Sequence, residues 1–367
     1  MNNIKNLELS ERINQLVALT ESLAKKHNKI ALYGYGTIGR LLSPYLADKL
    51  VAIVDQKPVE NLPYDIQVRT PDSLLTTDCD CIIVSVLGRE EYILNYLKNE
   101  LGLQTKIVTF SSTSLESNVR TPLPQDEYNK LFSLKGNFSG NRCFIIGNGP
   151  SLNKCDLTLL KNEYTFGVNS IFYKTREMGF KPTFYTVEDN HVIDDNLTEI
   201  NQLDCQYKFF PYRYKDQISS SENVYFFNYD QGFFHQSSAY FCSPRFSFNA
   251  AKEIFAGQTV TYSNIQLASF LGFTEIYLIG MDFSYTVPAS TDIINNTYLS
   301  NEADPNHFHP DYFGKGKKWH NPQLDRVLLN YIHAKEVLPY KGIKIINATV
   351  GGKLEIFQRV KYADLFN

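Results

Sequence analysis

The sequence predicts an α/β protein with two parallel-sheet domains, and three observations support this fold class. Short apolar strands alternate with helical segments along most of the chain, with few hairpin signals between them. A glycine-rich turn follows an apolar strand twice, at residue 34 and at residue 147. Residues 111–140 between the two series are polar and rich in Ser, Asn and Gly, which is typical of a linker. The predicted boundaries are therefore 1–110, 111–140 and 141–367.

The first series of elements occupies residues 1–110. Apolar residues recur at helical spacing in residues 9–27, and residues 40–50 have a helical pattern. Apolar runs predict strands at residues 29–33, 50–54, 81–86 and 106–110. The linker is expected to carry one short helix at residues 126–134.

The second series begins at residue 141. Its predicted strands cover residues 142–146, 165–169, 183–187, 222–228, 275–279 and 343–347. Helical patterns cover residues 261–270 and 323–338. Residues 285–320 are polar, aromatic and His-rich with little periodicity, and a loop this long inside a domain is usually a lid, a binding loop or disordered. We expect a lid here.

The composition excludes several functional classes. The formal net charge of −3 argues against a general nucleic-acid binder, which would carry a basic excess. The six cysteines form no CxxC pair and stand at no zinc-finger spacing from a histidine. The polar start of the chain and the lack of any uncharged apolar run of membrane-spanning length predict a soluble, cytoplasmic protein without a transmembrane segment. Peripheral association with a membrane and homo-oligomerisation stay open.

The first glycine-rich turn has the pattern Gly34-x-Gly36-x-x-Gly39. It follows a strand and opens a helix, and Asp55 ends the next strand twenty-one residues after Gly34. This is the context of the dinucleotide-binding fingerprint, so the segment predicts a Rossmann-like domain. If a ligand binds there, a nucleotide or nucleotide-sugar phosphate is the natural candidate. The alternative is that the glycines only make the tight turn.

The second turn, Gly147-Asn-Gly-Pro-Ser151, also follows an apolar strand. Asn169 and Ser170 end the next strand, and the acidic pair Glu188-Asp189 ends the one after it. The carboxyl ends of parallel strands line the ligand crevice of such a sheet. We therefore expect polar side chains from all three strand ends to converge on one ligand, namely Asn148, Ser151, Asn169, Glu188 and Asp189.

These motifs resemble a known family. IIGNGPSL at residues 145–152, VNS at 168–170, GQTVT at 257–261 and LGFTEIYLIGMDF at 271–283 look like the bacterial sialyltransferases of glycosyltransferase family 42. They are also similar to the motility-accessory-factor glycosyltransferases and the 6-hydroxymethylpterin diphosphokinase-like proteins. The resemblance covers residues 142–350. It implies a glycosyltransferase-A-variant domain with a lid loop.

The resemblance also implies a reaction. A nonulosonic, sialic-type acid would move from a CMP-activated donor to a glycan or glycoprotein, with no metal and no cofactor. At the donor it implies Asn148, Gly149, Ser151, Asn169, Thr259 and Thr261. The other donor-binding candidates that the sequence offers beside them are Gly147, Ser170, Glu188, Asp189 and Asp282. The leaving phosphate would be bound by Tyr285 with Tyr298 or Tyr312. The general base would be His320, although His307 and His309 lie close enough in sequence to leave that choice open.

Two other functions remain. Glu188 and Asp189 stand where the sialyltransferases have an Asn, and such a pair could hold Mg²⁺ with a nucleoside triphosphate. That would favour a diphosphokinase-like enzyme acting on a pterin or another small alcohol. The third possibility is a non-enzymatic nucleotide-sugar-binding scaffold, against which the clustered histidines argue. The run Lys315, Lys317 and Lys318 is either a solvated charge run or a positive rim for an anionic substrate.

Overall fold

The computed structural model describes residues 16–58, 67–87, 89–110, 123–235, 238, 240–294 and 297–366. Residue contacts divide the chain into two compact units, which we describe separately. The first unit comprises Met1–Val119 with Gln231–Arg245, and the second comprises Arg120–Asp230 with Phe246–Asn367. Residues 9–15 of the predicted first helix and residues 111–122 of the predicted linker lie outside the described residues. The domain boundaries predicted from the sequence stay a prediction.

The first unit contains a five-stranded parallel sheet in the order β3-β2-β1-β4-β5. Its strands are β1 (Ile30–Tyr33), β2 (Leu50–Val54), β3 (Val68–Arg69), β4 (Cys81–Val84) and β5 (Lys106–Thr109). Its helical segments are residues 16–26, α2 (Thr37–Leu42) and α3 (Glu90–Asn95). The predicted helix at residues 40–50 is instead the end of α2 followed by two short 3-10 turns.

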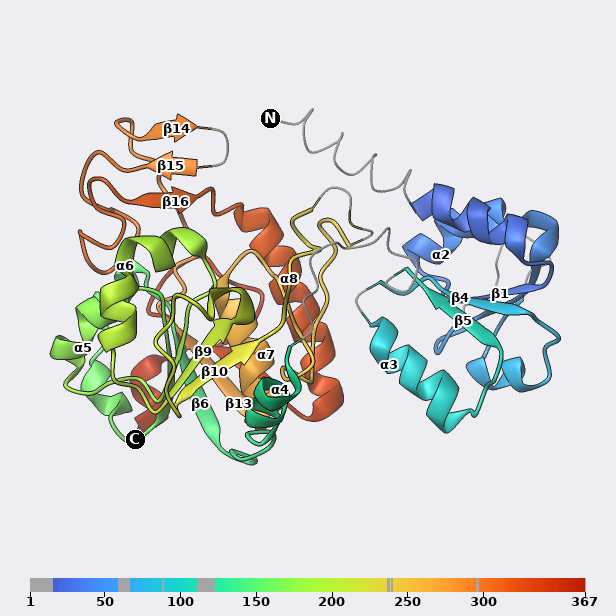
Figure 1. Cartoon of the computed structure of the whole chain (residues 1–367), viewed down its shortest axis with the longest axis horizontal. Helices are drawn as coiled ribbons and strands as arrows, with labels where there is room; N and C mark the ends of the chain where they lie inside the picture. Colours follow the sequence, from blue (N-terminus) through green and yellow to red (C-terminus); the bar gives the residue numbers. More distant parts are fainter. Residues whose placement is uncertain are drawn as a thin grey trace. The chain divides into compact units, whose positions relative to one another are not determined.

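The second unit contains an eight-stranded parallel sheet in the order β10-β9-β8-β7-β6-β13-β17-β18. Its strands are β6 (Arg142–Ile146), β7 (Tyr164–Val168), β8 (Phe184–Thr186), β9 (Tyr207–Pro211), β10 (Val224–Phe227), β13 (Glu275–Ile279), β17 (Lys344–Asn347) and β18 (Gln358–Arg359). Its helices are α4 (Gln125–Phe132), α5 (Phe172–Met178), α6 (Asn190–Gln202), α7 (Val260–Leu271) and α8 (Leu324–Val337) (Figure 1). The predicted α/β class with two parallel sheets is confirmed.

Side-chain alternation along the strands places a core on each face of the larger sheet. In β6, Cys143 and Ile145 belong to a core shared with α7 and α8, whereas Phe144 and Ile146 belong to a second core shared with α6. Both faces are therefore covered, which explains why these strands are continuous apolar runs in the sequence. The sheet of the first unit alternates in the same way, with Ile30 and Ala31 in different cores.

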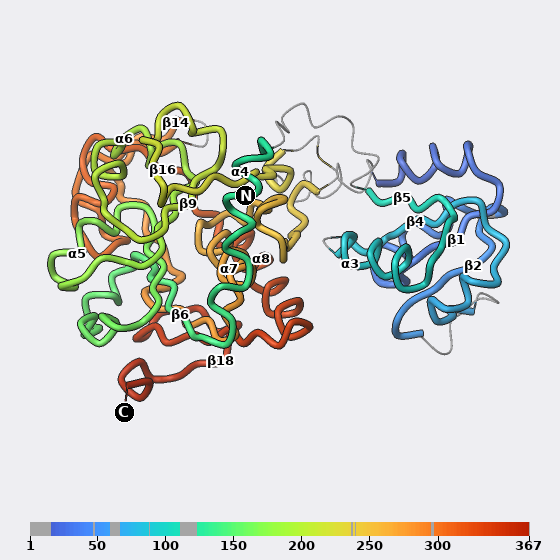
Figure 2. The backbone as a smooth tube through the Cα atoms, turned by 60° about the horizontal axis from the view of Figure 1, so that its bottom comes forward, coloured from blue at the N-terminus to red at the C-terminus, as the bar shows by residue number. Residues whose placement is uncertain are grey.

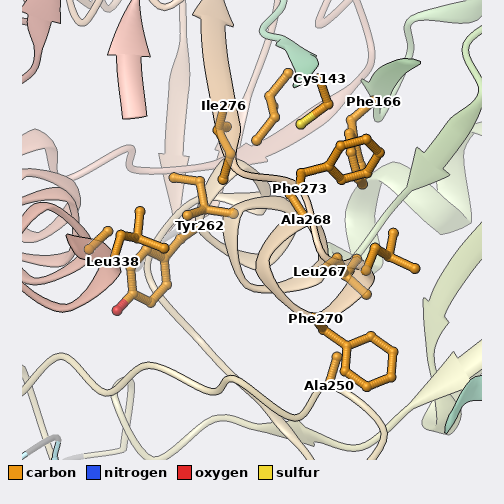
Figure 3. Packing of buried hydrophobic residues seen from close by; sticks show 14 of the residues in the cluster. Cys143, Phe166, Ala250, Tyr262, Leu267, Ala268, Phe270, Phe273, Ile276 and Leu338 are labelled. Atoms are coloured by element: carbon orange, nitrogen blue, oxygen red, sulfur yellow. The ribbon is translucent and has the colours of Figure 1, made fainter. Parts of the chain in front are cut away.

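The helix α7 is buried along almost its whole length, with Ser269 as the residue that escapes burial. A helix that is buried on all sides lies in the core, although α7 also carries the buried polar residues Ser263, Asn264 and Gln266. Figure 3 shows Tyr262, Leu267 and Phe270 of this helix among side chains from β6, β7 and β13. Thr259 caps its start by accepting a hydrogen bond from the backbone N–H of Thr261 (3.3 Å), and Gly272 ends it in the left-handed conformation.

The segment 285–320 differs from the aperiodic loop expected from the sequence. It contains β14 (Asp292–Ile294), β15 (Thr297–Leu299) and β16 (Lys318–His320), which form a three-stranded antiparallel sheet. Strands of three residues are too short to show periodicity, and all three residues of β14 are exposed. Both backbone views place this sheet beside α6 (Figures 1 and 2). The lid and the glycosyltransferase-A-variant assignment stay predictions.

A small two-stranded parallel pair, β11 (Tyr229–Asp230) with β12 (Ile254–Phe255), precedes α7. Among the residues that the structure describes, no helix has the length and apolar character needed to cross a membrane.

Candidate functional site

The order in which the chain adds strands to the larger sheet reverses between β6 and β13. From β6 the chain proceeds through β7, β8, β9 and β10 on one side, and β13 and β17 lie on the other. In open α/β sheets, ligands bind outside the carboxyl ends of the strands at such a switch point. The loops that leave β6 and β13 touch there: the backbone N–H of Gly147 donates to Ile279 O (2.8 Å) and that of Gly149 to Gly280 O (3.0 Å).

Two predicted asparagines meet at this edge through a tyrosine. The Asn148 amide donates to Val168 O at 2.9 Å and to the Tyr312 hydroxyl at 2.8 Å. That hydroxyl also forms a hydrogen bond with the Asn169 side chain, while Tyr185 donates to Asn169 O at 2.6 Å. Burial raises the pKa of Tyr312 above its ordinary value, so the hydroxyl stays neutral. Tyr312 thus holds the ends of β6 and β7 in one network.

Several buried polar atoms at the same edge have no partner among the described residues. They come from the ends of three neighbouring strands: Asn148 Oδ1, Asn169 Oδ1, Ser170 Oγ and Thr186 Oγ1. Buried polar atoms are normally paired, because an unpaired one costs about 1–3 kcal/mol. A row of them along one sheet edge is typical of a surface that binds a polar ligand or ordered water.

Backbone strain occurs in three of the motifs. Asn169, Gln258 and Phe283 have positive φ angles of 47°, 64° and 52°. Residues other than Gly rarely adopt this conformation, and such strain clusters at functional sites. Asn169 follows β7, Gln258 precedes α7, and Phe283 follows Asp282 after β13.

Ser151 and Asp282 bind each other. The Ser151 hydroxyl donates to Asp282 Oδ2 at 2.6 Å, and the Ser151 backbone N–H lies 3.2 Å from both carboxylate oxygens. The carboxylate also packs on Gly149, where a Cβ would lie 2.0 Å from Asp282 Oδ2. Asp282 therefore orders the turn after β6, and the donor contact predicted for Ser151 stays a prediction.

Glu188 is a buried carboxyl at the end of β8. Ser263, in the first turn of α7, and Tyr229 form hydrogen bonds with it, and Arg213 donates to its backbone carbonyl at 3.0 Å. Burial raises the pKa of Glu188 from 4.5 to about 7, against the hydrogen bonds from Ser263 and Tyr229. This carboxyl is therefore an acid that exchanges its proton near neutral pH.

Asp189 has different partners. Its Oδ1 caps α6 by accepting from the backbone N–H of His191 at 2.8 Å, and its Oδ2 lies 3.6 Å from His320 Nε2. The rings of His191 and His320 stack with centroids 4.3 Å apart. Glu188 and Asp189 thus bond to separate groups. Across the described ranges, no cluster of three or more His, Cys, Asp or Glu could hold a metal ion.

The other two candidate histidines have different surroundings. His307 Nδ1 lies 2.6 Å from the buried Asp304 Oδ2, and its ring stacks on Tyr312 at 3.9 Å. Despite burial, hydrogen bonds from His307 and two backbone N–H groups lower the pKa of Asp304 below its ordinary value. His309 instead stacks on Tyr173 of α5 at 4.7 Å.

The remaining predicted residues have packing partners. Tyr285 packs against the Trp319 ring with centroids 5.3 Å apart, and Tyr298 stacks on the same ring with centroids 4.5 Å apart. Thr259 and Thr261 form hydrogen bonds with Tyr331 of α8, across the contact between α7 and α8 visible in Figure 2. Lys317 donates to Tyr173 (3.0 Å) and Asn196 (2.9 Å), so it is not a freely solvated charge.

The glycine turn of the first unit is built tightly. A Cβ on Gly39 would lie 2.0 Å from Gly34 O, and Gly34 has a φ of 99°. Asp55 Oδ2 accepts from the backbone N–H of Tyr35 at 2.7 Å, which ties the end of β2 to the turn. A Cβ on Gly36 would meet no atom within 4 Å. Gly34 and Gly39 are required by packing, whereas ligand binding at Gly36 and Asp55 stays a prediction.

Sequence reasoning missed His191, Ser263 and Asp304. His191 follows the strand end Glu188-Asp189 by two residues, and that position was a usable signal. Ser263 is 75 residues from its partner Glu188, so no local pattern reveals the pair. Asp304 stands three residues before His307, a spacing that signals a pair only when both side chains are known to face each other.

Part of the chain matches a known protein family. Residues 117–288 match the family described as 6-hydroxymethylpterin diphosphokinase MptE-like. No protein with a curated description matches the chain in sequence. Among solved structures, the MAf glycosyltransferase from Magnetospirillum magneticum AMB-1 is 13% identical with a TM-score of 0.37, over 95% of this chain and 62% of that one. The chain thus spans less than two thirds of that protein. The predicted similarity to the 6-hydroxymethylpterin diphosphokinase-like proteins is confirmed for residues 117–288.

Proposed function

We propose that the second unit is a glycosyltransferase that moves a nonulosonic, sialic-type acid from a CMP-activated donor to a glycan or glycoprotein. The observation that carries this proposal is the row of unpartnered buried polar atoms at the ends of β6, β7 and β8. The row begins at β6, beside the switch point of the sheet, where nucleotides bind in open α/β folds. The strained residue Asn169 belongs to the same row.

In this proposal, the donor nucleotide lies over the turn after β6 and beside Asn169. Asn148 and Asn169 offer amide oxygens to the base or ribose, and Tyr312 fixes both side chains through its hydroxyl. Tyr312 is almost fully buried, so it acts by positioning these amides. Tyr285, which is partly exposed, is the better candidate for contact with the leaving phosphate.

The transfer step needs a base and a stabilised leaving group. His320 accepts the proton of the acceptor hydroxyl while that oxygen bonds to the anomeric carbon. The bond from the anomeric carbon to the phosphate oxygen breaks, and its electron pair leaves with CMP. His320 fits the role because Asp189 faces its ring at 3.6 Å and can stabilise the imidazolium that forms. His320→Ala should lower turnover by about 100- to 10,000-fold and change donor affinity little.

A second candidate is phosphoryl-type transfer from a nucleoside triphosphate to a pterin or similar alcohol. The match of residues 117–288 to a 6-hydroxymethylpterin diphosphokinase-like family favours it. The separate partners of Glu188 and Asp189 weigh against the two-carboxylate Mg²⁺ site that it would use.

A thermal-shift panel separates the two candidates. The full chain is melted with CMP, CMP-sialic acid, ATP and NAD, each with and without Mg²⁺. We expect CMP and CMP-sialic acid to raise the melting temperature equally with and without Mg²⁺, because a ligand that binds only the native state stabilises it. Stabilisation by ATP with Mg²⁺ alone would support the phosphoryl-transfer candidate, and stabilisation by NAD alone would point to the first unit. Either result would contradict the CMP-sugar proposal.

A further inference from the structure

Two histidines from different elements stack at the carboxyl end of β8. His191 lies in the first turn of α6 and His320 ends β16, with ring centroids 4.3 Å apart and ring planes 29° apart. One nitrogen of each ring, His191 Nε2 and His320 Nδ1, is buried without a partner among the described residues. The remaining ring nitrogens are His191 Nδ1, 3.3 Å from the Asn190 amide, and His320 Nε2, 3.6 Å from Asp189.

A single carboxylate fixes both histidines. Asp189 Oδ1 accepts the backbone N–H of His191 at 2.8 Å, while Asp189 Oδ2 faces the ring of His320 at 3.6 Å. Among the described residues, Asp195 on α6 and Lys318 on β16 also act electrostatically on His191. Asp195 also accepts the backbone N–H of Lys318 at 3.2 Å, so the strand that carries His320 is tied to α6 next to the stacked rings.

We propose that His191 is a positioning residue for His320, and that the two stacked rings with Asp189 form one unit that takes its first proton on His320. This inference rests on the proposed function, in which His320 is the base. Two positively charged rings at this distance repel each other, so the second proton is taken only at lower pH. The carboxylate selects His320 for the first proton because Asp189 Oδ2 faces that ring.

The electrostatics of His191 agree with this geometry. Burial lowers the pKa of His191, and the neighbouring His320 lowers it further, against the opposing effects of Asp189 and Asp195. Both effects favour the neutral form of the His191 ring beside His320. A neutral ring packed on the imidazolium holds its plane without competing for the charge.

Ring-nitrogen NMR of the full chain tests the order of protonation. Histidine signals are assigned with single variants and followed from pH 8 to pH 4.5. We expect His191 to take its proton after His320, and His320→Phe to raise the titration midpoint of His191 by about one unit or more, the coupling at which two sites titrate together. Asp189→Asn keeps a capping side chain but removes the charge, so the first proton should then be shared between the rings. His27→Phe, in the first unit, should leave the pair unchanged.

Donor turnover tests the positioning role. With CMP-sialic acid as the probe, His191→Ala should lower kcat by about 10- to 100-fold with donor KM unchanged, since small misplacement of a catalytic group has this effect. His191→Phe, which retains a stacking ring, should restore most of kcat. Equal loss in both variants, or an unmoved His191 midpoint in His320→Phe, would overturn the inference.

The two proposals fail separately. If the wild-type protein neither binds nor turns over CMP-sialic acid, the proposed function fails, and the NMR titration still decides whether the pair takes its first proton on His320. If the wild-type protein is active but His191 takes the first proton, the inference fails and the proposed function stands.

Discussion

At the scale of single residues, Glu188 links the stability of the second unit to pH. Burial raises its pKa from 4.5 to about 7 in the folded chain. Because the pKa is higher in the folded chain, protonated Glu188 contributes its full stabilisation of the fold below pH 4.5. This contribution is lost as the pH rises to about 7. The shift corresponds to about 3 kcal/mol at the upper end of that window.

The Glu188→Gln variant should therefore be more stable than the wild type at pH 8. At pH 5 it should be as stable as the wild type or less stable. The gain at pH 8 should be about 2 kcal/mol, because Gln keeps the neutral shape but gives up one accepted hydrogen bond. Melting temperatures at pH 5, 6, 7 and 8 measure the difference. Glu199→Gln, on the exposed face of α6, is the matched control and should show no such trend. A difference that does not change with pH would refute the buried-acid interpretation.

Some site residues could be predicted from the sequence because their positions depend on local rules. Asn148 and Asn169 follow apolar strands within two residues, and the ends of parallel strands meet at one edge of a sheet. Their shared partner Tyr312 is 164 residues from Asn148, so only the folded chain shows that it joins them. The same holds for Asp282, whose partner Ser151 is 131 residues away, so its hydrogen bond is visible only in the folded chain; its predicted place beside the donor stays a prediction.

At the scale of elements, the crossing of the loops after β6 and β13 depends on two glycines. Gly280 has a φ of 69°, and a Cβ there would lie 2.4 Å from Gly147 O. Gly280→Ala should therefore destabilise the second unit through both strain and overlap with backbone that cannot yield.

A matched glycine separates the two effects. Gly179, at the end of α5, has a φ of 72° but would place a Cβ more than 4 Å from any other atom. Gly179→Ala should cost only the left-handed strain of about 1–2 kcal/mol. Gly280→Ala should cost about 2 kcal/mol more than that. Equal losses in chemical denaturation would show that the two loops are not in tight contact.

The elements that sequence reasoning predicted are those with continuous apolar runs, such as β6 and β13. The strand β9 (YKFFP) was missed because it contains Lys208 and ends in Pro211. Lys208 is buried because its ammonium donates to the carbonyls of Ile200 (2.8 Å) and Asn201 (3.1 Å) at the end of α6. Its strand position depends on this tertiary contact, which no local pattern contains.

At the scale of the whole molecule, each unit has its own sheet and its own buried cores. We expect two unfolding transitions in calorimetry. Ile83→Ala, in β4, should destabilise only the first unit and lower its free energy of unfolding by about 2–5 kcal/mol. Phe209→Ala, in β9, should destabilise only the second unit and lower its free energy of unfolding by about 3–5 kcal/mol. A single transition that both variants shift equally would contradict two independently cored units.

The central claim is that the edge formed by the ends of β6, β7 and β8 binds the donor nucleotide. Calorimetric titration of CMP into the wild type and into Asn169→Gly tests it directly, because glycine keeps the left-handed backbone and removes only the amide. Asn129→Ala, on the exposed face of α4, is the control. We predict that CMP binds the wild type and the control alike, and that Asn169→Gly weakens binding by about 5- to 30-fold, the loss of one or two hydrogen bonds. No binding of CMP to the wild type, or equal affinity in Asn169→Gly, would contradict the account.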